Sequence, residues 1–328
     1  MALLAITSCG FNIEVPWEGS LRKEGLVDSV DSTIVTVAES LLPRLIFPKW
    51  MYKLPITRSF TDLQNFLKDE VASKKAELAE QKSSGALDMQ NKNLFTRVVM
   101  SSLQEGSKGL NDDDIIGNLF TYLFAGHEST ASAMVITLAL LALNQQEQDR
   151  IHKYIMSTVG LRDLNYEDYN ELTPVLHCLH EALRLYPPAP LGLRLSDEET
   201  SVVAPGIIPG NDTLPIPRNT QVILDFIAVG LNTRVFDDPS HFRPLRWSSD
   251  DVSADDLFAF GYGPRGCLGR KFSMVEAVCF LTHLLRDWQF DIKLDNNETR
   301  SEWQERVMRP KLEVTMRIDD IPLLVKRR

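Results

Sequence analysis

FGYGPRGCLG, residues 260–269, sets one cysteine between two glycines and two residues after an arginine. The pattern that follows predicts an amphipathic helix from about Gly269 to Asp287. A thiolate at Cys267 would then sit at the first turn of this helix, where backbone N–H groups and the helix dipole stabilise negative charge. Such a thiolate is a nucleophile, a redox thiol or a metal ligand, and the loop by itself leaves all three roles open.

Upstream, the sequence predicts a long central helix from Asn111 or Asp112 to Leu143, opened by three aspartates at its positive end. Its middle reads AGHEST, residues 125–130. Glycine costs about 1 kcal/mol in a helix interior, and an acid beside two hydroxyl residues is unusual in an apolar core. Function is expected where two local rules break together. The alternative, a tolerated glycine with polar residues facing water, has equal weight on this stretch alone.

The same stretch has the length of a membrane span, yet it contains His127 and Glu128. Charges are costly in lipid, so we expect a buried core helix and no transmembrane segment. The apolar residues 1–6 are too few to span a bilayer.

A further helix is predicted from Thr173, as a cap, and Pro174 to the prolines at 187 and 188. Glu181 and Arg184 are three residues apart, so they lie on one helical face and can pair. Alone, this spacing is typical of a surface ion pair worth less than about 1 kcal/mol.

Past residue 190, short β-prone runs alternate with proline and glycine, and residues 211–218 predict turns. The runs are Ser201–Val203, Thr220–Leu224, Leu312–Met316 and Leu323–Val325. The pattern predicts a mainly α fold with a small β-rich portion. We expect one domain over residues 1–328, mainly helical over 1–190, with the β-rich segment, the cysteine loop and the C-terminal helix in 191–328.

Composition narrows the function classes. The chain has 328 residues, 44% hydrophobic and 24% charged, as in a soluble globular protein. Its net charge of −10 argues against nucleic-acid binding. The four cysteines show no C-x-x-C spacing, which predicts reduced thiols in a chain that faces the cytosol.

The spacing Phe260-x-x-Gly263-x-Arg265-x-Cys267-x-Gly269 resembles the haem-thiolate loop of the cytochrome P-450 family. The resemblance implies haem b as cofactor, with Cys267 as the axial ligand of its iron. Phe260 would cover the sulfur and limit access of water. Gly263 and Gly269 would permit the tight loop and the close approach of the porphyrin.

Three further segments resemble family elements in the family's order. Residues 125–128 resemble the oxygen-activating kink of the long helix, Glu181-x-x-Arg184 the E-x-x-R helix, and residues 242–247 the segment whose arginine, here Arg246, completes a Glu–Arg–Arg network. That network would be largely buried and would lock the loop behind the haem. The overall pattern is most similar to fungal microsomal members.

The resemblance assigns the remaining polar residues to the two sides of the haem. Arg265 and Arg194 would pair with the haem propionates. Across the haem, Gly126 would let the helix open a groove for dioxygen, and the neighbouring polar groups would deliver protons. These groups are Glu128, Ser129 and Thr130. The family's usual threonine is replaced by Ser129, a hydroxyl with more rotamer freedom.

The implied function is a monooxygenase that inserts one oxygen atom of O2 into a small apolar substrate, in secondary metabolism. Electrons would come from NADPH through NADPH–cytochrome P-450 reductase, and the chain would be a monomer without nucleic-acid partners. A full-length relative would sit on the cytosolic face of the endoplasmic reticulum membrane. In this chain the anchor and about the first third of the fold are expected to be missing, which would leave it peripheral or cytosolic.

Three other hypotheses remain from the residues. One is a haem-thiolate isomerase or dehydratase that does not use O2. Another is a truncated, non-catalytic remnant that binds haem poorly. The third, a cysteine-nucleophile hydrolase, needs a basic partner that the sequence near Cys267 lacks.

Overall fold

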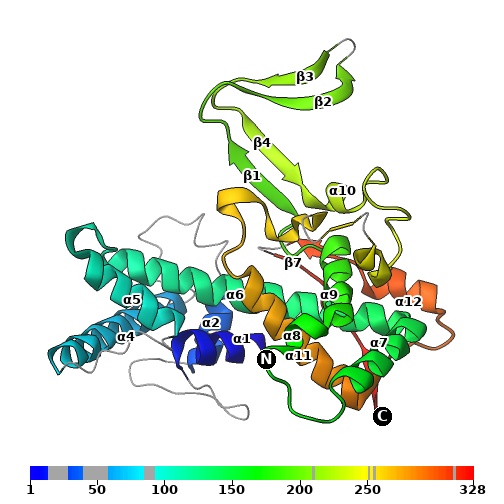
Figure 1. The fold of residues 1–328 in the computed structure, drawn as a ribbon, viewed down its shortest axis with the longest axis horizontal. Coiled ribbons are helices and arrows are strands. Elements are labelled where there is room, and N and C mark those ends of the chain that lie inside the picture. The colour runs from blue at the N-terminus through cyan, green and yellow to red at the C-terminus, as the bar shows by residue number, and fades with distance from the viewer. Residues whose placement is uncertain are drawn as a thin grey trace. The chain divides into compact units, whose positions relative to one another are not determined.

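The computed structural model describes residues 1–13, 29–39, 58–84, 93–208, 211–249, 252–253, 256–312 and 315–328. Within them the fold is mainly helical with small antiparallel hairpins, as predicted (Figure 1). The chain divides into two compact units, Met1–Ala131 and Ser132–Arg328. The expectation of a single domain with a change of character near residue 190 remains a prediction.

The N-terminal unit is built from helices around one apolar core. The apolar spacing of Leu63, Phe66, Leu67 and Val71 predicts a helix over residues 63–82. The structure confirms it and extends it, because α4 runs from Arg58 to Ser83. Its residues Leu63, Leu67 and Val71 recur at helical spacing and are 1–2% exposed, which places one face of α4 in the core. The other elements are α1 (Ala2–Ala5), the π-helix η1 (Ile6–Gly10), α2 (Val30–Glu39), α5 (Leu94–Glu105), η4 (Gly106–Lys108) and the first part of α6.

Helix α6 (Asp112–Leu143) is the long helix that the sequence predicts, and Asn111 caps it by accepting a 2.9 Å hydrogen bond from the Asp114 N–H. The helix continues without a break through Gly126. A Cβ at Gly126 would lie 3.3 Å from Cγ1 of Ile6, so glycine lets these two segments of the N-terminal unit pack closely. Among the described helices, only α6 has the length and hydropathy to cross a membrane, and 56% of its most apolar window is buried, which favours a core helix.

The C-terminal unit packs its helices around a second apolar core that includes Ile151, Val175, Leu281 and Trp303. Helix α11 (Arg270–Asp287), the helix predicted after the cysteine, packs against α9 (Thr173–Leu185) and α7 (Gln145–Thr158). The remaining helical elements are α8 (Asp168–Glu171), α10 (Phe226–Gly230), η5 (Pro244–Ser248), η7 (Phe258–Phe260), η8 (Gly263–Arg265) and α12 (Arg300–Val307).

Four antiparallel pairs of strands complete this unit. They are β1 (Leu191–Leu195) with β4 (Gln221–Asp225), β2 (Thr200–Ile208) with β3 (Asn211–Ile216), β5 (Trp288–Ile292) with β8 (Leu323–Arg327), and β6 (Lys311–Leu312) with β7 (Met316–Arg317). The β1–β4 and β2–β3 pairs project from the helical body of the unit (Figure 1).

Several local predictions were wrong. Residues 211–216 form strand β3 instead of turns, because pairing with β2, from Thr200 opposite Ile216 to Val203 opposite Thr213, outweighs their turn-like composition. Pro215 is tolerated there because a two-stranded sheet consists of edge strands. Thr173 does not cap α9: it is the first helical residue, and its hydroxyl donates to the Asn170 carbonyl at 3.0 Å. Of the strand expected over 312–316, Leu312 lies in β6 and Met316 in β7, which pair with each other, and residues 313–314 lie outside the described residues.

Candidate functional site

A buried carboxylate organises the C-terminal unit. Glu181 lies on the inner face of α9, and its side chain is 0% exposed. Arg184, one turn later, donates from Nε to Oε2 at 2.9 Å and from Nη2 to Oε1 at 2.7 Å, and its side chain is 1% exposed. The alternative of a surface ion pair was therefore wrong, since a two-pronged pair shielded from water is a stronger, charge-assisted contact.

Residues of the 3₁₀-helix η5 also donate hydrogen bonds to this carboxylate. Arg246 donates from Nε to Oε1 at 2.9 Å, and the indole Nε1 of Trp247 donates to Oε2 at 2.9 Å. The backbone N–H of Arg243 adds a third bond, to Oε1 at 2.9 Å. The structure thus brings the predicted Glu181, Arg184 and Arg246 together. Sequence reasoning missed the role of Trp247, although it follows Arg246 directly in the motif.

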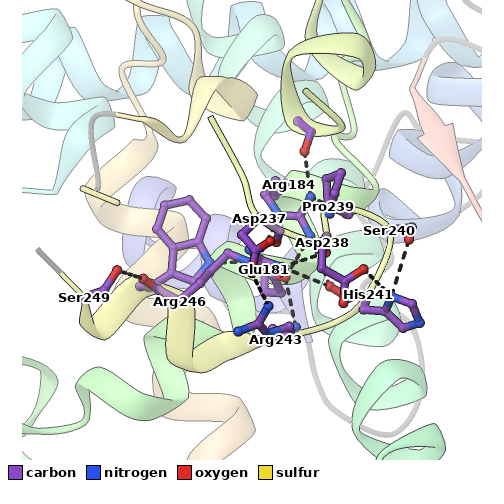
Figure 2. A network of polar contacts seen from close by, with 12 residues as sticks. Glu181, Arg184, Asp237, Asp238, Pro239, Ser240, His241, Arg243, Arg246 and Ser249 are labelled. Carbon is purple, nitrogen blue, oxygen red and sulfur yellow. Dashed lines mark hydrogen bonds and ion pairs between the residues drawn. The ribbon is translucent and has the colours of Figure 1, made fainter. Parts of the chain in front are cut away.

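The outward ends of both guanidinium groups are satisfied by backbone carbonyls (Figure 2). Arg184 Nη1 donates to the carbonyls of Gly230 and Pro239, each at 2.6 Å, and Arg246 Nη1 donates to that of Asp237 at 2.6 Å. A Cβ at Gly230 would lie 2.5 Å from the Arg184 carbonyl oxygen, so only glycine allows α10 to approach α9 this closely. Carbonyl oxygens disperse the positive charge without adding a second buried anion.

The cysteine loop is closed by its own backbone. The Cys267 N–H donates to the Phe260 carbonyl at 2.7 Å, and Gly261 and Gly263 both have φ of +67°, a conformation that favours glycine. The thiol is free and exposed. The sequence predicted that Cys267 lies in the first turn of the following helix. This was wrong, because helix α11 begins at Arg270 and Cys267 precedes it.

The other residues assigned to haem binding lie in the cysteine loop, residues 260–269, and on β1. Gly269 is part of the loop, and a Cβ there would lie 3.9 Å from the Cys267 sulfur. The Phe260 ring has the Arg270 guanidinium 5.7 Å from its centroid. Arg265 is exposed on the loop, whereas Arg194 is exposed on β1, where Nη1 donates to the Leu193 carbonyl at 2.9 Å.

The residues assigned to oxygen activation lie near the end of the N-terminal unit, on α6, whereas Cys267 belongs to the C-terminal unit. The Ser129 hydroxyl donates to the Ala125 carbonyl at 2.8 Å, and Thr130 is 5% exposed. Glu128 is half-buried on the same turn.

Two histidines precede the Glu–Arg pair on α9. Burial is the main cause that lowers the pKa of His180 to about 3, with smaller contributions from His177 and Arg270, so His180 is neutral at ordinary pH. Within the described residues, no cluster of three or more His, Cys, Asp or Glu could hold a metal ion.

The chemistry of the loop suits a haem group. An accessible sulfur is the soft ligand that a haem iron accepts. The exposed Leu268 and Tyr262 offer apolar contacts, 80% and 62% exposed respectively, and Arg265 offers a guanidinium for a carboxylate. The residues present therefore fit an apolar macrocycle with iron at its centre and acidic side groups. Ligation of such an iron by a cysteine thiolate defines the haem-thiolate proteins.

Comparisons with known proteins agree with this class. The family model for cytochrome P-450 matches residues 1–317. Cytochrome P-450 monooxygenase 124 of Postia placenta is 30% identical, over 100% of this chain and 64% of its own length. Cytochrome P-450 monooxygenase prx9 of Penicillium rubens is 27% identical, over 88% of this chain and 56% of its own length. A cytochrome P-450 crystal structure, CYP102L1, superposes with a TM-score of 0.76 at 17% identity, covering 100% of this chain and 66% of that one.

The chain belongs to the cytochrome P-450 family. It spans 64% and 56% of the lengths of the two fungal relatives. The family implies haem ligated by a cysteine thiolate.

Proposed function

We propose that this chain is the haem-binding part of a monooxygenase that inserts one oxygen atom of O2 into an apolar organic substrate. The observation that carries the proposal is the exposed Cys267 on a closed glycine loop, in the same unit as a buried Glu181–Arg184–Arg246 network. The fungal relatives are named as monooxygenases, which supports the same reaction class.

On the cysteine side, each residue has a binding or shielding role. Haem held by the Cys267 thiolate would supply the activation of dioxygen. Phe260 is proposed to shield the sulfur from water once haem is bound, and the Arg270 guanidinium makes a cation–π contact with its ring. Arg265 and Arg194 are proposed to pair with the two propionates.

A separate role is proposed for α6, which supplies groups that move protons. Glu128 is the proposed proton source, and Ser129 the relay, since its Oγ–H can leave the Ala125 carbonyl and donate elsewhere. Thr130 adds a second hydroxyl beside it. Gly126 allows the close packing of this turn, and it is proposed to open the groove for dioxygen.

The partners follow from the same proposal. Arg265, Arg270 and Lys271 place positive charge around the cysteine loop despite the net charge of −10, which suits an acidic electron donor. We propose NADPH–cytochrome P-450 reductase as that donor, a monomeric chain, and a location on the cytosolic face of the endoplasmic reticulum.

The test is an absorption spectrum of the reduced protein under carbon monoxide, for the wild type and for Cys267→Ser. We expect a strongly red-shifted Soret band in the wild type and none in the variant, because only a thiolate ligand produces that shift. A wild type without a haem band, or with an unshifted one, would refute the proposal. NADPH consumption that depends on both substrate and reductase would separate a monooxygenase from an isomerase or dehydratase.

A further inference from the structure

The Glu181 carboxylate accepts five hydrogen bonds, and they are divided unequally between its oxygens. Oε1 accepts three, from Arg184, Arg246 and the backbone of Arg243, whereas Oε2 accepts only those from Arg184 Nε and Trp247 Nε1. Arg184 grips both oxygens from α9. Trp247 is therefore the residue through which η5 also reaches the second oxygen.

Arg246 and Trp247 together donate one hydrogen bond to each oxygen of the carboxylate, as the Arg184 guanidinium does alone. The bond from Arg246 goes to Oε1 and that from Trp247 to Oε2, each at 2.9 Å. Without the indole N–H, η5 would hold the carboxylate through Oε1 alone and could pivot about it. A two-point attachment fixes orientation where a one-point attachment does not.

The indole is held in position by its neighbours. Its ring meets the edge of the His180 imidazole at a centroid distance of 5.2 Å and an interplanar angle of 69°, and Phe236 packs at 6.1 Å. His180 is 4% exposed and Trp247 7%. Because burial keeps the imidazole uncharged, it adds no third cation beside the two guanidinium groups.

Glu181 is placed where its orientation affects the cysteine loop. Helix α9 packs against η7, which ends at Phe260, and against α11, which begins just after Gly269. The helix thus contacts the elements on both sides of the loop. A change in how η5 and α9 are joined would be transmitted to the segment that presents Cys267.

We propose that Trp247 is a positioning residue: its indole N–H orients the Glu181 carboxylate between the two arginines and so fixes the loop that carries Cys267. This inference rests on the proposed haem-binding function. The simpler explanation is that Trp247 only fills space in the core.

The chain offers a matched control for that explanation. Trp303 is 0% exposed in the core of the same unit, and its Nε1 has no hydrogen-bond partner among the described residues. Trp247→Phe and Trp303→Phe remove the same atoms from a buried indole, and only the first removes a hydrogen bond to a carboxylate. Their difference reports on that bond.

Haem-loaded wild type and both variants would be compared by transfer of haem to an apo-globin acceptor and by the reduced carbon monoxide spectrum. We expect Trp247→Phe to release haem about tenfold faster, the scale of one hydrogen bond to a charged group, and to lose part of its red-shifted Soret band. Trp303→Phe should lower only the unfolding temperature. Equal release rates and spectra for the two variants would overturn the proposal.

A measurement without haem separates this inference from the proposed function. Exchange of the indole N–H protons in the apo-protein would be followed by NMR in the wild type and in Glu181→Gln. We expect the lower stability of the variant to accelerate exchange at both indoles. Loss of the acceptor charge should accelerate exchange at Trp247 about tenfold beyond that at Trp303. Equal acceleration at both indoles would overturn the role of Trp247 even if haem binding is established, and this readout does not require Trp247→Phe to fold.

Discussion

Glu181→Gln changes the charge of the carboxylate with almost no change of shape, so its effect can be worked out from the donors around it. With the amide oxygen at the Oε1 position, three donors keep an acceptor, but Arg184 Nε–H and Trp247 Nε1–H face the amide NH2. With the amide turned over, its NH2 group lies at the Oε1 position, and the three donors there lose their acceptor. Either orientation leaves at least two buried donors unpaired.

The expected cost follows from two independent routes. Two unsatisfied buried donors at about 1–3 kcal/mol each give about 2–6 kcal/mol. Removing one charge from a buried ion pair costs about 3–5 kcal/mol, and here two guanidinium groups with 1% and 5% exposed side chains lose their counter-ion. A loss of about 3–5 kcal/mol is a large share of a typical stability of about 5–15 kcal/mol.

The assay is urea unfolding of the purified chain together with its haem content after expression. Glu147→Gln is the matched control, because Arg150 also lies three residues later and also binds its carboxylate in a two-pronged way, at 2.9 and 2.5 Å. That pair is more exposed, at 35% for Arg150 and 16% for Glu147. We expect the control to cost at most about 1 kcal/mol and to retain full haem content.

Two results would contradict this expectation: an equal loss of unfolding free energy in the two glutamine variants, or a haem content in Glu181→Gln that equals that of the wild type. Either result would mean that the buried network is dispensable, because neutral amides of equal size would then satisfy it. A loss of unfolding free energy and haem content confined to Glu181→Gln would support the role of the network in holding the cysteine loop in place.

Three further predictions concern other groups. Ser129→Thr should release less hydrogen peroxide per NADPH consumed, because a β-branched hydroxyl has fewer rotamers; equal release would contradict the relay role. Burial raises the pKa of Glu276 above its ordinary value, to about 7, so the folded state holds a proton that the unfolded chain releases and stability should fall as pH rises from 5 to 8; Glu276→Gln should remove that slope in thermal unfolding. His241→Ala should change the unfolding free energy by less than about 1 kcal/mol, since its pair with Asp238 is 73% and 45% exposed.

The helices of the fold were predictable because their signals are local. The aspartates before α6, the periodic leucines of α4 and the prolines around α9 each act within a turn or two of chain. Strand β3 was missed because its pairing with β2 is the decisive force, and its own residues, with Pro215 among them, favour turns. Non-local pairing leaves little trace in the sequence of one strand.

The candidate site shows the same limit in sharper form. Glu147-x-x-Arg150 and Glu181-x-x-Arg184 have identical spacing, and both pairs form in helices of the same unit. What distinguishes them is that the second pair is shielded by segments distant in sequence, among them η5 and α10. Only the resemblance to a family singled out the second pair in advance.

The structure of the cysteine loop explains why contacts from neighbouring helices are needed to hold it in place. Its internal order comes from backbone hydrogen bonds, such as Cys267 N–H to the Phe260 carbonyl, and its residues from Tyr262 to Gly269 are exposed. Apolar packing therefore contributes little to holding the sulfur in place, and glycines add conformational freedom that must be restrained. The restraint has to come from the helices on either side, α9 and α11, and the buried ion-pair contacts between α9 and η5 all converge on the Glu181 carboxylate. Glu181 alone therefore contributes much of the restraint on the loop. In a loop with a packed core, many side chains would contribute it.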